Sequence, residues 1–277
     1  MDEILQATEM KSPPLLKGVW NRSAYPILKL VPLLKNFIHV ENCEQIQKVK
    51  APVIFAFNHN CSYETLLVPA FVMYLRQWEK ISFIIDWMYG QIPILKWLFN
   101  QVDPIYVYNK RARFIFFEKN RHLNRMKDYY DHKTVYNRCI DYLSLHRSIG
   151  IFPEGKRNKN PTLLSKGRSG IGRIVLESNV PVLPIGIDFP NRINNHKIPK
   201  FGSIILRAGE VLEFPNERKI LTELPQHEDL SPHSVSIIKN YLSSKITYAV
   251  MSRLSELSGK EYPFTSPERP EEVERFL

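Results

Sequence analysis

The chain has 277 residues, which is close to the size at which a single hydrophobic core stops growing. Hydrophobic residues make up 44% and charged residues 24%, which excludes a disordered, collagenous or disulfide-scaffold chain. The 38 Lys and Arg residues exceed the 28 Asp and Glu residues, so the net charge is +10 and anionic partners such as nucleic acid, acidic lipid or phosphorylated substrates are favoured.

The three cysteines, Cys43, Cys61 and Cys139, are widely spaced and form no C-x-x-C pair. This spacing indicates neither a zinc site nor a disulfide framework, and it suits a reducing compartment. We therefore expect no metal and no cofactor.

Residues 1–37 are expected to form a leader and an amphipathic helix that associates with a membrane. The helical pattern covers 23–40 and is interrupted by Pro32. Because Lys29 and Lys35 break its apolar run, the segment is too short and too charged to cross a bilayer. It can lie on a bilayer with its leucines inward, or it can be a helix that packs on the core.

Short apolar strands alternate with helical patterns along the rest of the chain. The expected strands are 52–57, 81–85, 105–108, 148–152, 180–187 and 203–213. The expected helices are 63–76, 92–99, 135–146, 167–179 and 231–258, followed by a surface tail. This alternation predicts an α/β fold: a mixed, mostly parallel sheet flanked by helices, with an N-terminal amphipathic helix and a C-terminal helix.

A first chemical motif, NHNCSYE at residues 58–64, directly follows the first expected strand. If His59 lies on the strand-to-helix turn, Glu64 falls in the first helical turn, where Ser62 or Asn60 can cap the helix and the chain can fold back. A carboxylate on one ring nitrogen makes the other more basic, so such a pair can deprotonate an alcohol. A capping or surface role is the alternative.

A second motif, IFPEGKR at residues 151–157, also follows an expected strand. Gly155 permits a turn that other residues resist, and Lys156 and Arg157 are cations where the strand ends of an α/β sheet collect ligands. Arg157 suits a phosphate, while Glu154 can accept from a substrate hydroxyl or hold Arg157. A solvated surface turn is the alternative.

The third motif is the strand VPVLPIGI at residues 180–187. Its two prolines, Pro181 and Pro184, argue against a central position in the ladder, or for a bulge. Taken by itself, this strand is a packing element.

In this order and spacing, the three motifs resemble those of the glycerolipid acyltransferase superfamily, which includes the glycerol-3-phosphate and 1-acylglycerol-3-phosphate acyltransferases. The family pattern NHxxxxD is matched with Glu64 in place of Asp, as in the similar lipid A acyltransferases. FPEGTRS is matched at 152–158 with Lys and Asn replacing Thr and Ser, and VPVxPxxI at 180–187. The likeness covers roughly 38–215, which we expect to be an acyltransferase domain, with 216–277 forming a C-terminal helix and tail packed on it.

The resemblance implies transfer of a fatty acyl group from a thioester, either acyl-CoA or an acyl group on acyl carrier protein, to a hydroxyl acceptor. His59 is then the general base, and Glu64 orients it. The acceptor is a lysophospholipid or a glycerol-phosphate-type molecule, as in phospholipid biosynthesis. The residues implied to bind substrate are Asn58, Glu154, Gly155, Lys156, Arg157 and Pro184.

One departure from the family concerns its second motif, which normally supplies a phosphate-binding Arg. Asn109 aligns with that Arg here, and Lys110, Arg111 or Arg113 can substitute for it. An acceptor without glycerol phosphate, such as a neutral lipid, an amine or a natural product, is therefore an alternative.

The basic and aromatic stretch 110–127 has three interpretations. It can meet anionic headgroups with its phenylalanines inserted, bind nucleic acid by stacking bases, or form a solvated basic helix with a Phe core face. No nucleic-acid fold signature accompanies it, so we expect no nucleic-acid partner. With 23–40, it predicts a cytoplasmic protein, peripheral on the inner face of a membrane and attracted to its anionic surface.

Two other function classes compete with transfer. A thioester or lipid hydrolase needs a nucleophile in a strained elbow, usually G-x-S-x-G, and residues 167–170 lack that spacing. A non-catalytic lipid-binding relative is the other class, and the intact His59–Glu64 and Glu154–Arg157 sets argue against it.

Overall fold

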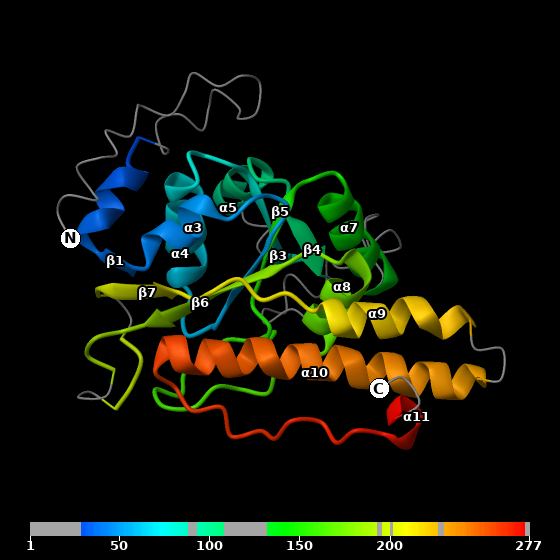
Figure 1. Cartoon of the computed structure of the whole chain (residues 1–277). Helices are drawn as coiled ribbons and strands as arrows, with labels where there is room; N and C mark the ends of the chain where they lie inside the picture. Colours follow the sequence, from blue (N-terminus) through cyan, green and yellow to red (C-terminus); the bar gives the residue numbers. More distant parts are fainter. Residues whose placement is uncertain are drawn as a thin grey trace, which may run out of the picture.

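The sheet of this protein has seven strands in the order β1-β7-β6-β2-β5-β3-β4. The computed structural model describes residues 29–87, 93–107, 132–192, 196–199, 202–226 and 230–274. Neighbouring strands are parallel except for β6 and β7, which are antiparallel. The predicted α/β fold, with a mixed, mostly parallel sheet flanked by helices, is confirmed (Figure 1).

The strands of the sheet are β1 Ile38–Glu41, β2 Ile54–Phe57, β3 Ile81–Asp86, β4 Ile105–Val107, β5 Ser148–Ile151, β6 Val182–Asp188 and β7 Ile204–Ala208. The helices are η2 Val31–Asn36, α3 Cys43–Lys48, α4 Glu64–Leu75, α5 Pro93–Asn100, α7 His132–Ser144, α8 Gly170–Ser178, α9 Pro215–Glu223, η5 Leu224–Gln226, α10 Pro232–Ser258 and α11 Glu271–Glu274. All six expected strands and all five expected helices between 52 and 258 are therefore present.

The N-terminal amphipathic helix expected over 23–40 is wrong from Val31 onward. Residues 31–36 form the short 3-10 helix η2, with Pro32 in its first turn, and β1 pairs in parallel with β7. Pro32 lacks the N–H that a longer helix would need, and β1 alternates buried and exposed side chains as a half-buried edge strand does. Residues 23–28 lie outside the described residues.

Two apolar clusters cover the two faces of the sheet. Phe55 and Phe57 of β2 belong to the cluster that includes α4, whereas Ile54 and Ala56 belong to the cluster that includes α7, α8 and α10. Successive side chains of a strand point to opposite faces, so β2 is buried on both sides. The first motif therefore begins at the end of a strand that is buried on both faces.

Pro184 lies inside β6, and the ladder beside it is interrupted. Ile185 of β6 pairs with Ala208 of β7, and the next pairing is a single bridge between Val182 and Leu212. Residues 183–184 of β6 therefore lie opposite three residues, 209–211, of the segment that follows β7. The Pro184 carbonyl accepts a hydrogen bond from the backbone N–H of Gly209 at 2.9 Å. The proline nitrogen thus falls at a bulge, which is one of the two predicted alternatives. The other alternative, a position away from the centre of the sheet, is wrong, because β6 lies between β7 and β2.

The long helix α10 crosses one face of the sheet and packs on α8 and β6 (Figure 1). Its ends were predicted correctly, because Ser231 accepts a hydrogen bond from the Ser234 backbone and Gly259 ends the helix in a left-handed conformation. The division into 1–37, 38–215 and 216–277 stays a prediction. No helix in the described part of the chain is long and apolar enough to cross a membrane.

Candidate active site

The candidate site forms where three neighbouring strands end. β6, β2 and β5 are adjacent and mutually parallel, so the chain leaves all three at the same edge of the sheet. The NHNCSYE segment follows β2, the IFPEGKR segment follows β5, and Asp188 ends β6. Ligands of α/β sheets collect at such carboxyl ends.

The predicted pair of His59 and Glu64 is present. Nδ1 of His59 lies 3.0 Å from Oε1 of Glu64, the first residue of α4. The Glu64 side chain is fully buried, while the His59 side chain keeps 14% of its surface exposed. The ring of Phe152 packs against the imidazole, with the ring centroids 4.7 Å apart. One side of the imidazole is therefore fixed, and the ring keeps contact with solvent.

The buried Glu64 carboxylate is surrounded by hydrogen-bond donors. Oε1 also accepts the backbone N–H groups of Asn60 and Cys61, and Oε2 accepts Nδ2 of Asn60 at 3.1 Å. These hydrogen bonds fix both oxygens of the carboxylate at the N-terminus of α4. The expected cap from Ser62 or Asn60 is absent, because Tyr63 precedes the helix without a side-chain hydrogen bond and the Glu64 carboxylate binds the preceding backbone instead.

This geometry sets the tautomer of the imidazole. A carboxylate accepts but does not donate, so the 3.0 Å contact places the proton of neutral His59 on Nδ1. The lone pair is then on Nε2, the nitrogen that can take a proton from a substrate.

Cys61 also approaches Glu64, with Sγ 3.6 Å from Oε2. Burial, and after it the Glu64 charge, raises the pKa of the Cys61 thiol to about 12. A thiol with such a pKa is protonated at neutral pH, and only the thiolate is a good nucleophile. The environment of Cys61 thus suits a packing role beside the pair.

Glu154 of the second motif joins the two motif loops instead of holding Arg157. It is 1% exposed, and its Oε1 and Oε2 accept the backbone N–H groups of His59 at 2.9 Å and Ser165 at 2.8 Å. The backbone N–H of Asn158 in turn donates to the His59 carbonyl at 2.7 Å. The backbone of His59 is therefore held on both sides by the loop that follows β5.

Gly155 and Arg157 shape the other side of this loop. Gly155 has a φ of +64°, a conformation that favours glycine, and a Cβ there would also displace the Arg168 side chain, whose Nε would lie 2.4 Å away. Arg157 donates to Oγ of Ser62, which brings the guanidinium to the NHNCSYE loop, while Lys156 is exposed. The structure therefore brings Arg157 to the first motif.

Two residues expected to bind substrate are buried away from solvent. Asn58 is fully buried and exchanges two hydrogen bonds with the backbone of Ile187, at 2.6 and 2.9 Å, so it joins the end of β2 to β6. Pro184 is buried within β6. The structure does not bring either side chain to an accessible surface. The other candidates, Lys110, Arg111 and Arg113, lie outside the described residues.

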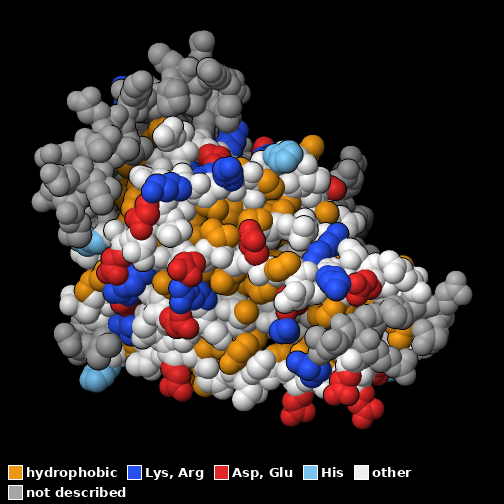
Figure 2. All heavy atoms as spheres, in the orientation of Figure 1, with side chains coloured by type: hydrophobic (Ala, Val, Ile, Leu, Met, Phe, Trp, Pro, Cys, Tyr) orange, Lys and Arg blue, Asp and Glu red, His pale blue; other side chains and the backbone are white. Residues whose placement is uncertain are grey.

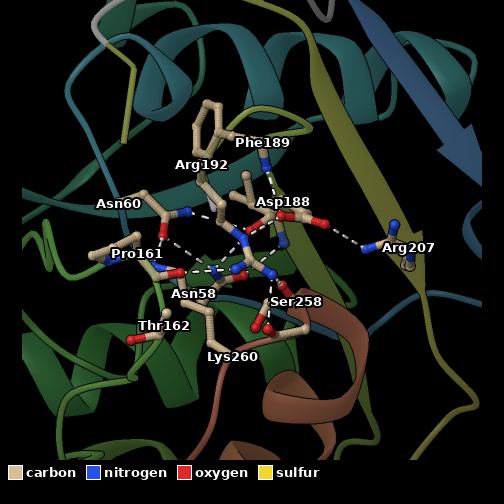
Figure 3. Close-up of polar contacts among 12 residues, drawn as sticks. Asn58, Asn60, Pro161, Thr162, Asp188, Phe189, Arg192, Arg207, Ser258 and Lys260 are labelled. Atoms are coloured by element: carbon tan, nitrogen blue, oxygen red, sulfur yellow. Dashed lines mark hydrogen bonds and ion pairs between the residues drawn. The ribbon is translucent and has the colours of Figure 1, made fainter. Parts of the chain in front are cut away.

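Two buried cations near the pair were not predicted. Arg192, 4% exposed, binds Asp188 at 2.5 Å and donates to the carbonyls of Pro161, Ser258 and Gly259 (Figure 3). Burial acts to raise the pKa of Asp188, but hydrogen bonds from Arg192 and Arg207 outweigh it and lower that pKa. Lys260, which follows α10, reaches Asn60. No motif marks these residues in the sequence.

The described residues contain no cluster of three His, Cys, Asp or Glu side chains able to hold a metal ion. The polar groups at the strand ends are instead one imidazole, buried carboxylates and cations.

Comparison with known proteins gives one family. The sequence model of the family described as Acyltransferase matches residues 37–188, just over half of the chain. No curated protein matches the chain significantly. A similar solved structure is the 1-acyl-sn-glycerophosphate (LPA) acyltransferase PlsC from Thermotoga maritima, with a TM-score of 0.45 and 17% sequence identity over 87% of this chain and 85% of that chain.

Proposed function

This chain belongs to the Acyltransferase family, and we propose that it transfers a fatty acyl group from a thioester to a hydroxyl acceptor, with His59 as the general base. The observation that supports this role is the 3.0 Å contact between Nδ1 of His59 and the buried carboxylate of Glu64. The family supports the reaction class, and this contact supports the choice of the imidazole as the base.

The reaction needs two proton transfers, one from the acceptor hydroxyl to His59 and one from His59 to the thiolate. Nε2 of His59 removes the proton of the acceptor hydroxyl as the oxygen attacks the thioester carbonyl carbon. The resulting tetrahedral intermediate collapses with cleavage of the C–S bond, and the imidazolium returns the proton to the departing thiolate. The products are an ester and a free thiol, so no covalent acyl-enzyme is required. Glu64 stabilises the imidazolium by its charge, and base catalysis of this kind contributes about 10²–10⁴ in rate.

For the acceptor we propose a lysophospholipid or a glycerol-phosphate-type molecule. Arg157 contacts the first motif through Ser62, and a guanidinium binds phosphate oxygens in a planar fork. Lys110, Arg111 or Arg113 is proposed to add a second cation from the segment where Asn109 replaces the family Arg. That replacement also supports the alternative of a neutral lipid, amine or natural-product acceptor.

We further propose that the protein is peripheral on the inner face of a membrane. Leu33 in η2 and the flanking Leu30 and Phe37 expose 55%, 60% and 56% of their surface. The stretch 110–127 carries seven Lys and Arg residues against one Glu. On the face shown in Figure 2, by contrast, Lys and Arg are interspersed with Asp and Glu over the described residues. Apolar insertion plus cationic attraction is the combination that holds a protein at an anionic surface.

Vesicle sedimentation tests this attachment. Binding to anionic vesicles should weaken as salt is raised, because exposed charges are screened, and Leu33→Ser should weaken it at every salt concentration. The matched control is Leu145→Ser, since Leu145 is 68% exposed near the end of α7. Equal binding to neutral and anionic vesicles would contradict the electrostatic part.

The activity itself is tested by incubating the pure protein with acyl-CoA and acyl carrier protein thioesters and a panel of acceptors, with products identified by mass spectrometry. The panel includes lysophospholipids, glycerol phosphates, neutral lipids and amines. We expect acylated acceptor and free thiol in equal amounts. Fatty acid released without any acceptor would assign the protein to the hydrolases. Lipid binding without turnover on any acceptor, unaffected by loss of His59, would assign it to the non-catalytic relatives.

A further inference from the structure

Lys260 lies between the two motif loops although it follows the last long helix. Its side chain is 2% exposed, and Nζ donates to Oδ1 of Asn60 at 2.5 Å and to the carbonyl of Asn160 at 2.7 Å. Figure 3 shows it directed into the same cluster as Asn58 and Arg192. One ammonium thus links the first motif to the loop that follows the second.

The backbone on both sides of Lys260 is fixed. Gly259 turns the chain at the end of α10 with a φ of +61°, and its carbonyl accepts from Arg192 at 2.7 Å. Glu261 donates to the carbonyl of Thr162 and accepts from the backbone N–H of Leu164, each at 2.8 Å. The segment after α10 is therefore bound to the loop at 160–164, and the position of the ammonium is set by the fold.

This ammonium is costly to keep in the interior. Burial lowers the pKa of Lys260 to about 8, although the Glu154 and Glu64 carboxylates, and more weakly Asp188, act to raise it, while Arg192 acts to lower it. A buried cation with this penalty adds little to stability compared with an apolar side chain of the same size. The contacts of Lys260 therefore suggest that it serves the active site and not stability alone.

We propose that Lys260 is a positioning residue for His59 and Glu64, acting through the side-chain amide of Asn60, and this inference rests on the proposed function of His59. An ammonium can only donate, so it requires Oδ1 of Asn60 on its side. The amide nitrogen then faces Glu64, where Nδ2 lies 3.1 Å from Oε2. With Oε2 held in this way, Oε1 faces Nδ1 of the imidazole.

The active site therefore extends beyond the segment that matches the family, which ends at residue 188. Lys260 contacts no group that reacts, so its effect reaches the chemistry through two side chains. A displaced carboxylate leaves the imidazole free to rotate or to change tautomer, and misplacements of about 1 Å can cost about 10²-fold in rate. The expected defect lies in kcat.

The test compares Lys260→Met, which keeps the length of the side chain but removes charge and donors, with Ser255→Ala. Ser255 Oγ donates to the backbone carbonyl of Lys260, so its loss loosens the same segment without touching the ammonium. We expect Lys260→Met to lower kcat by about 10- to 100-fold with little change in KM, and Ser255→Ala to stay within about twofold of wild type. Equal kcat losses in the two variants, or failure of Lys260→Met to fold, would overturn the proposal.

A double-mutant cycle tests the route through Asn60. In an Asn60→Ala background, Lys260→Met should cost less than about threefold further, because the intermediary is already gone. The same loss of kcat in both backgrounds would mean that Lys260 acts independently of Asn60, and it would overturn the proposal.

A readout that needs no turnover separates this inference from the proposed function. Histidine ¹⁵N NMR, with the His59 signal assigned by its absence in His59→Gln, reports which ring nitrogen carries the proton. We expect Nδ1 to carry it in wild type and the Nε2-protonated fraction to rise in Lys260→Met. If Lys260→Met shows this tautomer shift but the wild-type protein transfers no acyl group, the proposed function is wrong and the positioning role stands. If the tautomer of His59 is the same in Lys260→Met and wild type, the positioning role is wrong.

Discussion

Glu154 and His59 lie 95 residues apart in the sequence, and Oε1 of the glutamate accepts the backbone N–H of the histidine at 2.9 Å. The acid of the second motif therefore fixes the backbone that carries the imidazole. Both oxygens of Glu154 accept backbone N–H groups, so an amide at this position would place its own donor against one of them.

We expect Glu154→Gln to lower the free energy of unfolding by about 1–3 kcal/mol, since a buried donor loses its partner. Thermal melts measure this loss, and kcat should fall with it because the His59 backbone shifts. Glu210→Gln is the control, since Glu210 is exposed beyond β7. Equal melting temperatures for the two variants would contradict the structural role of Glu154.

The charge of Glu64 is tested by Glu64→Gln. The amide oxygen can still accept from the backbone and the imidazole, but the negative charge that stabilises the imidazolium is lost. We expect kcat/KM to fall by about 10²-fold or more, with a smaller change in KM than in kcat. Initial rates with a labelled acyl thioester measure this, and a variant with near wild-type kcat would show that the carboxylate charge is not needed.

The length of the Glu64 side chain is tested by Glu64→Asp, which restores the residue that the resemblance leads one to expect. The shorter side chain withdraws the carboxylate by roughly one C–C bond, about 1.5 Å, from an imidazole that lies at 3.0 Å. We expect a loss of about 10-fold in kcat. A fully active variant would mean that the loop adapts to either acid.

Arg157 is proposed to contact the acceptor. Arg157→Ala should raise KM for a phosphate-bearing acceptor by about 10-fold or more and leave KM for a neutral acceptor unchanged, because the lost interaction is with an anion. Arg157→Lys should restore part of the affinity, since it keeps the charge but not the planar fork. Equal losses on charged and neutral acceptors would contradict this role.

Lys260 gives a dependence of stability on pH. Its folded pKa of about 8 lies below its usual 10.5, so the unfolded chain binds more protons between these values. The free energy of unfolding should therefore rise with pH across this window, in total by on the order of 3 kcal/mol. Urea denaturation of wild type and Lys260→Met at pH 7.5 and 9.5 isolates this contribution, and equal pH dependence in the two proteins would contradict the buried ammonium.

Features that depend on short stretches of sequence were predictable. β2 is an apolar run because it is buried on both faces, and His59 and Glu64 meet because both lie within one strand-to-helix turn. Arg157 reaches the same place because β2 and β5 are parallel neighbours, as expected of an α/β sheet.

Features that depend on distant parts of the chain were not predictable. β1 was mistaken for a helix because its pairing with β7 is not visible in the apolar pattern. Glu154 was expected to contact Arg157 or substrate. The sequence does not show that both of its carboxylate oxygens accept backbone N–H groups. Lys260 and Arg192 have no motif, and their position depends on where the chain returns after α10.

The most direct measurement is the initial rate of acyl transfer by His59→Ala, with a labelled thioester and the best acceptor of the panel. His39→Ala is the matched control, because His39 is an exposed histidine on β1. The account predicts a loss of about 10²–10⁴-fold for His59→Ala with an unchanged melting temperature, and a wild-type rate for His39→Ala. A His59→Ala protein that transfers acyl groups at the wild-type rate would contradict the role of the imidazole.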